Sequence, residues 1–171
     1  MKNLTTALLT ATIAVGALAG CQTTPSTPST PDQNMGAAQP VNSKILQAYD
    51  WQLVDAKRAD GTKIAPLFYN PAKPLTLKFT TEVTNQSNED RVSFMNTCNN
   101  LGAAYSIRNG SVELNNALST MMSCPEPEAK FDSATMAIVQ GKYSVSQQGQ
   151  QAPVLTIQGK DTVAHFKAVK K

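Results

Sequence analysis

Few side chains in this 171-residue chain could carry out acid–base or nucleophilic chemistry. His165 is the single histidine, so a two-histidine zinc site is excluded and a catalytic triad would depend on this one ring. It alternates with Ala164 and Phe166, which indicates a strand residue with a structural or surface role. Glu126 and Glu128 stand at a helix-entry sequence, where they complement the helix dipole. The sequence contains no phosphate-binding glycine loop, nucleophile elbow or His-Glu-x-x-His motif, so we expect a non-catalytic protein without a metal or cofactor.

The first cysteine, Cys21, ends an N-terminal segment with the layout of an export signal. Lys2 precedes an uncharged run over residues 4–19, and small residues stand before the cysteine in Leu18-Ala19-Gly20-Cys21. The last four residues resemble the lipobox of bacterial lipoproteins, in which the cysteine becomes the first residue and its sulfur receives diacylglycerol. The alternatives are an ordinary signal peptide or a short membrane helix, but sixteen uncharged residues fall short of the roughly 20 that span a bilayer. We therefore expect residues 1–20 to be a lipoprotein signal peptide and the lipid on Cys21 to hold the chain on a membrane.

The rest of the chain divides into a tether and one domain. Gln22, rather than aspartate, follows the cysteine, which resembles the sorting signal of outer-membrane lipoproteins and predicts a cell-envelope location. Residues 21–45 are rich in Pro, Ser and Thr without apolar periodicity, which predicts a lipidated, flexible tether. Residues 46–171 suffice for a single core. Without the signal peptide, 14 basic and 12 acidic side chains remain, a balance that favours neither nucleic acid nor a polybasic membrane patch.

Two further cysteines, Cys98 and Cys124, form an even pair once Cys21 is lipidated. In an oxidising compartment such a pair predicts a disulfide, which would close a loop of about 27 residues and stabilise the fold by roughly 3 to 4 kcal/mol. The alternative is a soft-metal site for Cu(I), because Met95, Met121 and Met122 could bring thioether sulfur to the same place. Under the disulfide interpretation, the methionines fill irregular gaps in the core.

The elements that position these groups are predicted to be mostly strands. Apolar residues alternate with polar ones over seven or more stretches, as expected when one face of a sheet is buried. The large side chains of these runs are needed for a core before they can line a cavity, because aromatic residues make up only 6% of the chain. The runs centre on Trp51 and Leu53, Phe79, Phe94, Tyr105, Tyr143 and Val145, Val154 to Ile157, and Val163 to Val169 with Phe166.

Two local signals refine this pattern. Asn109-Gly110 predicts a type I′ turn, because both residues tolerate positive φ, and hence a hairpin. After Cys124, the sequence over residues 125–128 favours a helix start, and Phe131, Ala134, Thr135 and Ile138 then share one helical face. Gly141 is expected to end that helix. The predicted class is α+β, mostly β: a strongly curved antiparallel sheet or partly open small barrel with one helix.

The sequence around the two later cysteines resembles the META/HslJ family. Residues 96–100 (Asn-Thr-Cys-Asn-Asn) are similar to the family's Gly-Cys-Asn motif, and residues 120–124 (Thr-Met-Met-Ser-Cys) to its Thr-x-Met-x-Cys motif. The resemblance extends over about residues 46–169. It implies a small β-rich domain with one helix and makes Asn99, Thr120 and Met122 the special positions. The side chains of Asn99 and Thr120 are expected to hydrogen-bond the backbone at the end of the sheet.

The resemblance brings no reaction or ligand with it. The family fold is similar to that of lipoprotein pilotins, which implies that it could offer a crevice for an acyl chain or an apolar peptide. We therefore expect a membrane-tethered, non-catalytic and stress-related envelope lipoprotein that binds a protein segment or an apolar ligand. The alternative function is soft-metal (copper) binding through Met and Cys sulfur.

Overall fold

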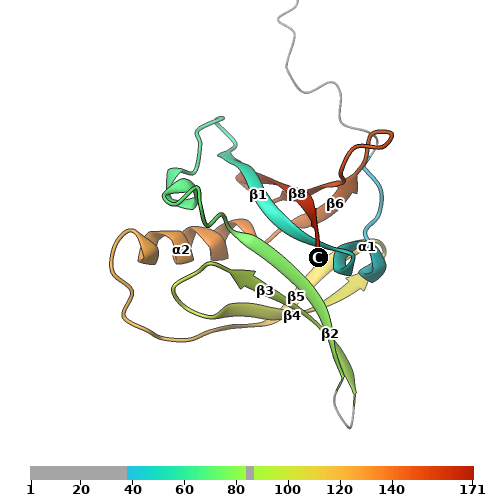
Figure 1. Cartoon of the computed structure of the whole chain (residues 1–171), viewed down its shortest axis with the longest axis horizontal. Helices are drawn as coiled ribbons and strands as arrows, with labels where there is room; N and C mark the ends of the chain where they lie inside the picture. The colour runs from blue at the N-terminus through green and yellow to red at the C-terminus, as the bar shows by residue number, and fades with distance from the viewer. Residues whose placement is uncertain (1–37, 84–86) are drawn as a thin grey trace, which may run out of the picture. The chain divides into compact units, whose positions relative to one another are not determined.

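A computed structural model describes residues 38–83 and 87–171 of the chain, and these form one β-rich domain (Figure 1). Its eight strands make a single antiparallel sheet, in the order β5-β4-β3-β2-β1-β8-β7-β6, that curls into a half-barrel. The predicted fold class is confirmed. The strands are β1 (Tyr49–Arg58), β2 (Thr76–Val83), β3 (Asn88–Met95), β4 (Leu101–Arg108), β5 (Ser111–Ser119), β6 (Lys142–Ser146), β7 (Val154–Gln158) and β8 (Thr162–Lys170).

The core lies on the inner face of the curled sheet. Trp51, Phe79 and Phe166 are fully buried, and Leu53 and Phe94 nearly so, which confirms their prediction as core residues. Register explains how they meet: Trp51 lies opposite Leu77 on one neighbouring strand and Ala168 on the other. Because side chains alternate between faces along a strand, this register directs the apolar members of each run inward.

The predicted hairpin connects β4 to β5. Asn109 has φ 51° and Gly110 φ 74°, the positive values that a type I′ turn requires. The turn pairs Arg108 with Ser111 and Ile107 with Val112, so it sets the register of the whole β4–β5 ladder up to an irregularity between Gly102 and Ala104.

Three short elements cover the ends of the sheet. α1 (Ser43–Gln47) begins after Asn42, whose side chain accepts a hydrogen bond from the Ile45 N–H. The 3-10 helix η1 (Ala65–Phe68) interrupts the proline-rich connection between β1 and β2. α2 (Glu128–Ile138) follows the predicted entry sequence, and Phe131, Thr135 and Ile138 are buried on one face. None of the helices within residues 38–83 and 87–171 has the length and apolar character needed to cross a membrane.

Gly141 does not end α2. The helix ends at Ile138, and the Val139 N–H caps it by donating to Thr135 O at 3.2 Å. Gly141 instead lies against the backbone of Gln158, where a Cβ would collide with the Gln158 carbonyl oxygen. The glycine is therefore required by the close approach of two chain segments rather than by helix termination.

The folded part begins before residue 46. Gln39 pairs with Val145 of β6, Val41 is 3% exposed, and α1 starts at Ser43. Residues 39–45 therefore belong to the domain rather than to the tether predicted for them. The signal peptide, Cys21 and the greater part of the tether lie outside the described residues.

Candidate functional site

The two family motifs meet at one end of the sheet through a disulfide. Cys98, in the loop between β3 and β4, is bonded to Cys124, in the segment between β5 and α2; their Cα atoms are 6.1 Å apart. Two segments separated by 26 residues are thus fixed beside the first turns of α2.

Asp132 of α2 organises this end of the molecule. One of its carboxylate oxygens accepts the Cys98 N–H at 2.9 Å, and the other accepts the Asn99 N–H at 2.8 Å. The residue is only 7% exposed, so these bonds compensate for burial of a charge. The helix therefore holds the cysteine loop through a single carboxylate that binds two successive backbone amides.

Asn99 uses its whole side-chain amide to join three segments. Its Nδ2 donates to Asp132 Oδ2 at 3.1 Å and to Cys124 Sγ at 3.0 Å. Its Oδ1 accepts the Thr120 hydroxyl at 3.1 Å and the Met122 N–H at 2.7 Å. Both donors and the acceptor of the amide are occupied, which makes Asn99 a fixed connection rather than a free ligand-binding group.

Thr120 completes the network from the opposite segment. The Thr120 hydroxyl accepts the Asn100 N–H at 3.0 Å, and the backbone N–H of Thr120 donates to the Asn100 carbonyl at 3.2 Å. The side chains of Asn99 and Thr120 thus bond backbone groups at the end of the sheet. For Met122 the hydrogen bond comes from the backbone, and its side chain is left free of the network.

A depression of about 320 Å³ lies beside this network. Met122 and Met136 contribute thioether surface to it, and Asn99, Asp132 and Ser133 contribute polar groups. The prediction that the nearby methionines fill the core is wrong: Met121 is 100% exposed, Met122 59% and Met95 42%. Leu118, near the end of β5, is also 59% exposed. The exposed side chains of Met121 and Met122, on the segment that follows β5, are here called the methionine surface.

The sulfur atoms and the buried carboxylate also lie within metal-ligand distance of one another. Donor atoms of Cys98, Cys124 and Asp132 are all within 4.8 Å. In the disulfide form, however, the sulfur atoms lack the thiolate charge that binds metals, and the carboxylate already accepts three N–H groups. The donor chemistry of this state does not fit a soft-metal site.

The remaining candidate groups lie elsewhere in the structure. His165 of β8 is half-buried, and its Nδ1 lies 3.1 Å from the Thr156 hydroxyl on β7. Glu128 occupies the first turn of α2, and Glu126 lies 3.7 Å from Lys130 in an exposed ion pair. Neither pair includes a residue of the network around the disulfide.

Sequence reasoning missed Asp132. It lies between Phe131 and Thr135 on the face of α2 that points to the core, and both neighbours are buried. A carboxylate at a core-facing position of an amphipathic helix requires partners, so its place in the helical period was the signal available.

Comparison with known proteins identifies the family. A model of the META domain matches residues 44–170, so the chain belongs to the META domain family. An NMR structure of a protein from Burkholderia xenovorans is similar to it, with 23% identity and a TM-score of 0.55 over 84% of this chain and 100% of that chain. A second NMR structure has 17% identity and a TM-score of 0.43 over 74% of this chain and 94% of that chain. Among curated proteins, none matches this chain. The likeness to the first structure concerns the fold alone.

Proposed function

We propose that this protein is a lipoprotein of the outer membrane, anchored through acyl chains on Cys21, whose META domain is a non-catalytic binding module for an apolar segment of another envelope protein. The observation that carries the binding role is the methionine surface. Met121 and Met122 present flexible, polarisable side chains to solvent from a segment held in place by the disulfide and by Asn99. Exposed methionine side chains can adapt their conformation to apolar groups of different shapes, so they are suited to binding such groups.

The shape of the site favours a protein segment over a small apolar ligand. Met122 lines the 320 Å³ depression but Met121 does not, and the lining includes the polar residues Asn99 and Asp132. A small apolar ligand requires a concave, mostly apolar cavity, whereas a protein segment can lie across exposed thioethers.

The anchor is supported by the lipobox-like sequence that ends in Cys21. If Cys21 carries the lipid, Cys21→Ala will abolish acylation and release the domain from the membrane fraction. Mass spectrometry of the N-terminal peptide measures the modification directly. An unacylated N-terminus in the wild-type chain would contradict the proposed anchor without affecting the binding role.

The binding role is tested by comparing variants in pull-downs from solubilised envelopes. The double variant Met121→Ser/Met122→Ser removes the thioethers, and Val83→Ser, at a 78% exposed position of β2, is the matched loss of an apolar side chain elsewhere. Proteins held by the wild type and by Val83→Ser, but lost from the double variant, are the expected result. Equal capture by all three would contradict the proposal, and loss of a co-eluting lipid alone would assign the surface to an apolar ligand.

A further inference from the structure

The curled sheet leaves a gap between its two edge strands. β5 and β6 are the last members of the sheet on either side, and they lie near each other without forming a ladder. An edge strand presents backbone N–H and C=O groups that are available for pairing. The gap between β5 and β6 is therefore the place where the sheet could accept another extended chain.

One end of this gap is already occupied by the chain itself. Residues 38–41, here called the strap, run antiparallel to β6: the Gln39 N–H donates to Val145 O at 2.9 Å, and the Val145 N–H donates to Gln39 O at 3.4 Å. The strap then leaves β6, because Pro40 has no N–H and the Val41 N–H donates to Gly110 O at 3.2 Å. The edge of β6 thus accepts an extended chain, but the strap covers only part of it.

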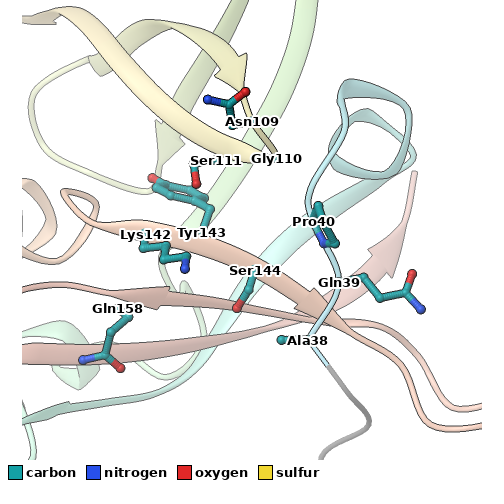
Figure 2. A pocket seen from close by; sticks show the side chains of 10 residues that line it. All are labelled: Ala38, Gln39, Pro40, Asn109, Gly110, Ser111, Lys142, Tyr143, Ser144 and Gln158. Carbon is teal, nitrogen blue, oxygen red and sulfur yellow. The ribbon is translucent and has the colours of Figure 1, made fainter.

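The uncovered part of the edge borders a cavity of about 370 Å³, shown in Figure 2. Gly110 and Ser111 of the hairpin line one side, and Tyr143 and Ser144 of β6 line the other. Because backbone groups alternate in direction along a strand, the N–H and C=O of Tyr143 point to the same side as those of Val145, into the gap. The cavity therefore offers backbone pairing in continuation of the strap.

The charge of the cavity favours a carboxylate. Among the residues that the structure describes, Lys142 is the one charged residue that lines the cavity, and the other polar groups are amides and hydroxyls, among them Asn109, Ser111 and Gln158 (Figure 2). Lys142 is exposed and forms no ion pair within the part of the chain that the structure describes. An unpaired ammonium at the end of a backbone-pairing edge attracts an anionic group.

We propose that this cavity binds the C-terminal residues of a partner protein, as an extended strand antiparallel to β6 with its terminal carboxylate on Lys142. The direction follows from the strap. The strap occupies the edge at Val145, so a partner chain with the same antiparallel direction passes Ser144 and Tyr143 before Lys142, and its C-terminus arrives at the ammonium. The volume, near the lower limit for ligand pockets, suits a few terminal residues rather than a long segment. Main-chain pairing and carboxylate capture provide the recognition.

This site is independent of the proposed lipid anchor and of the methionine surface. Its residues belong to the hairpin turn, β6 and the strap, whereas the methionine surface belongs to the segment after β5. The residues that a peptide probe contacts therefore distinguish binding in the cavity from binding at the methionine surface.

The experiment uses the ¹⁵N-labelled full chain in detergent micelles and an acetylated hexapeptide of alternating threonine and valine with a free C-terminal carboxylate. The same peptide with a C-terminal amide is the matched probe. The carboxylate peptide, at millimolar concentration, should shift the amide resonances of Gly110, Ser111 and Tyr143. The amide peptide should bind about three- to fivefold more weakly, the discrimination expected of one exposed ion pair.

Lys142→Gln should remove the difference between the two peptides, and Lys73→Gln, an exposed lysine outside the cavity, should retain it. Absence of any shift, or equal affinity of the two peptides for the wild type, would overturn the proposal. Shifts confined to Met121 and Met122 would also overturn it, while leaving the proposed function intact.

Discussion

Asp132 shows how one buried side chain can determine the conformation of a loop far away in the sequence. Its carboxylate binds the amides of Cys98 and Asn99, and Asn99 in turn holds Thr120 and Met122. The methionine surface is therefore supported by a chain of hydrogen bonds that begins on α2, independently of the disulfide. Removal of the carboxylate would leave backbone donors buried without a partner of equal strength.

We expect Asp132→Asn to lower the free energy of unfolding by about 1 to 3 kcal/mol, because an amide accepts fewer N–H groups than a carboxylate and forms weaker bonds to them. Urea unfolding measures the loss. Asp161→Asn, at an exposed turn, is the control and should be close to neutral. Equal stability of Asp132→Asn and the wild type would show that the disulfide alone holds the loop.

Tyr143 is the second residue whose environment decides its chemistry. It is fully buried, its hydroxyl donates to Val139 O at 2.7 Å, and burial raises the pKa of the phenol well above its ordinary value of 10.0. The unfolded chain therefore releases this proton near pH 10 while the folded chain retains it. Stability is fully present below pH 10 and falls as the pH rises above that value.

Replacement of Tyr143 by phenylalanine should destabilise the fold more near pH 7 than near pH 11. Near pH 7 the variant should be less stable by about 1 to 2 kcal/mol, because the Val139 carbonyl loses its buried donor. By pH 11 the difference in free energy of unfolding should shrink by about 1.4 kcal/mol. The reason is that the Tyr143 phenol ionises in the unfolded wild type but not in the folded one, whereas phenylalanine does not titrate. Urea midpoints from pH 7 to 11 test this, and a constant difference across the range would contradict a buried, protonated phenol.

At the scale of elements, the β4–β5 hairpin has two tasks. Gly110 provides the positive φ of the turn, and its carbonyl accepts the Val41 N–H from the strap. A Cβ at this position would also press against Pro40. Gly110 thus both forms the hairpin turn and holds the strap that covers part of the β6 edge.

Gly110→Ala should therefore lower the free energy of unfolding more than an ordinary glycine substitution at positive φ. Gly149→Ala is the matched control, because Gly149 has φ 52° and a Cβ added there would have no neighbour within 4 Å. Gly149→Ala should lower stability by about 1 to 2 kcal/mol through backbone strain alone. Gly110→Ala should lower it further and speed amide hydrogen exchange at Gln39 and Val145. Equal effects of the two variants would mean that the strap tolerates displacement.

The elements were largely predictable because their signals are local. Alternating apolar residues around Trp51 and Phe79, and the Asn109-Gly110 pair, determine strands and turn within a few residues of sequence. The strap was not predictable, because its composition is that of the tether and its position depends on non-local contacts with β6 and Gly110. Gly141 was misinterpreted for the same reason, since its role depends on Gln158, a non-local neighbour.

The candidate site was predictable only in part. The family motifs located Asn99, Thr120 and Met122, and the exposure of the methionines reversed the expectation that they fill the core. Patterns of residue type cannot distinguish a buried from an exposed methionine in a segment without periodicity. The role of Asp132 was not predicted because its partners, Cys98 and Asn99, belong to a single loop 33 and 34 residues away.

At the scale of the whole molecule, the disulfide joins the loop after β3 to the segment before α2. Cys98 follows β3 and Cys124 precedes α2, so the bridge limits the freedom of the unfolded chain over β4 and β5. The double variant Cys98→Ala/Cys124→Ala should be less stable by about 3 to 4 kcal/mol, with a Tm lower by roughly 10 °C. Thermal unfolding of the variant, with reduced wild type as the control, measures this. A Tm equal to that of the oxidised wild type would contradict a stabilising bridge.

The order of the strands also constrains biosynthesis. β8 ends at Lys170, yet it lies in the middle of the sheet beside β1, and β6 and β7 reach the other five strands only through it. A nascent polypeptide leaving a ribosome or a translocation channel therefore holds two groups of strands without a shared ladder until β8 has emerged. Completion of the sheet therefore waits for β8, and a chain that stops before β8 lacks the strand that pairs β1 with β7.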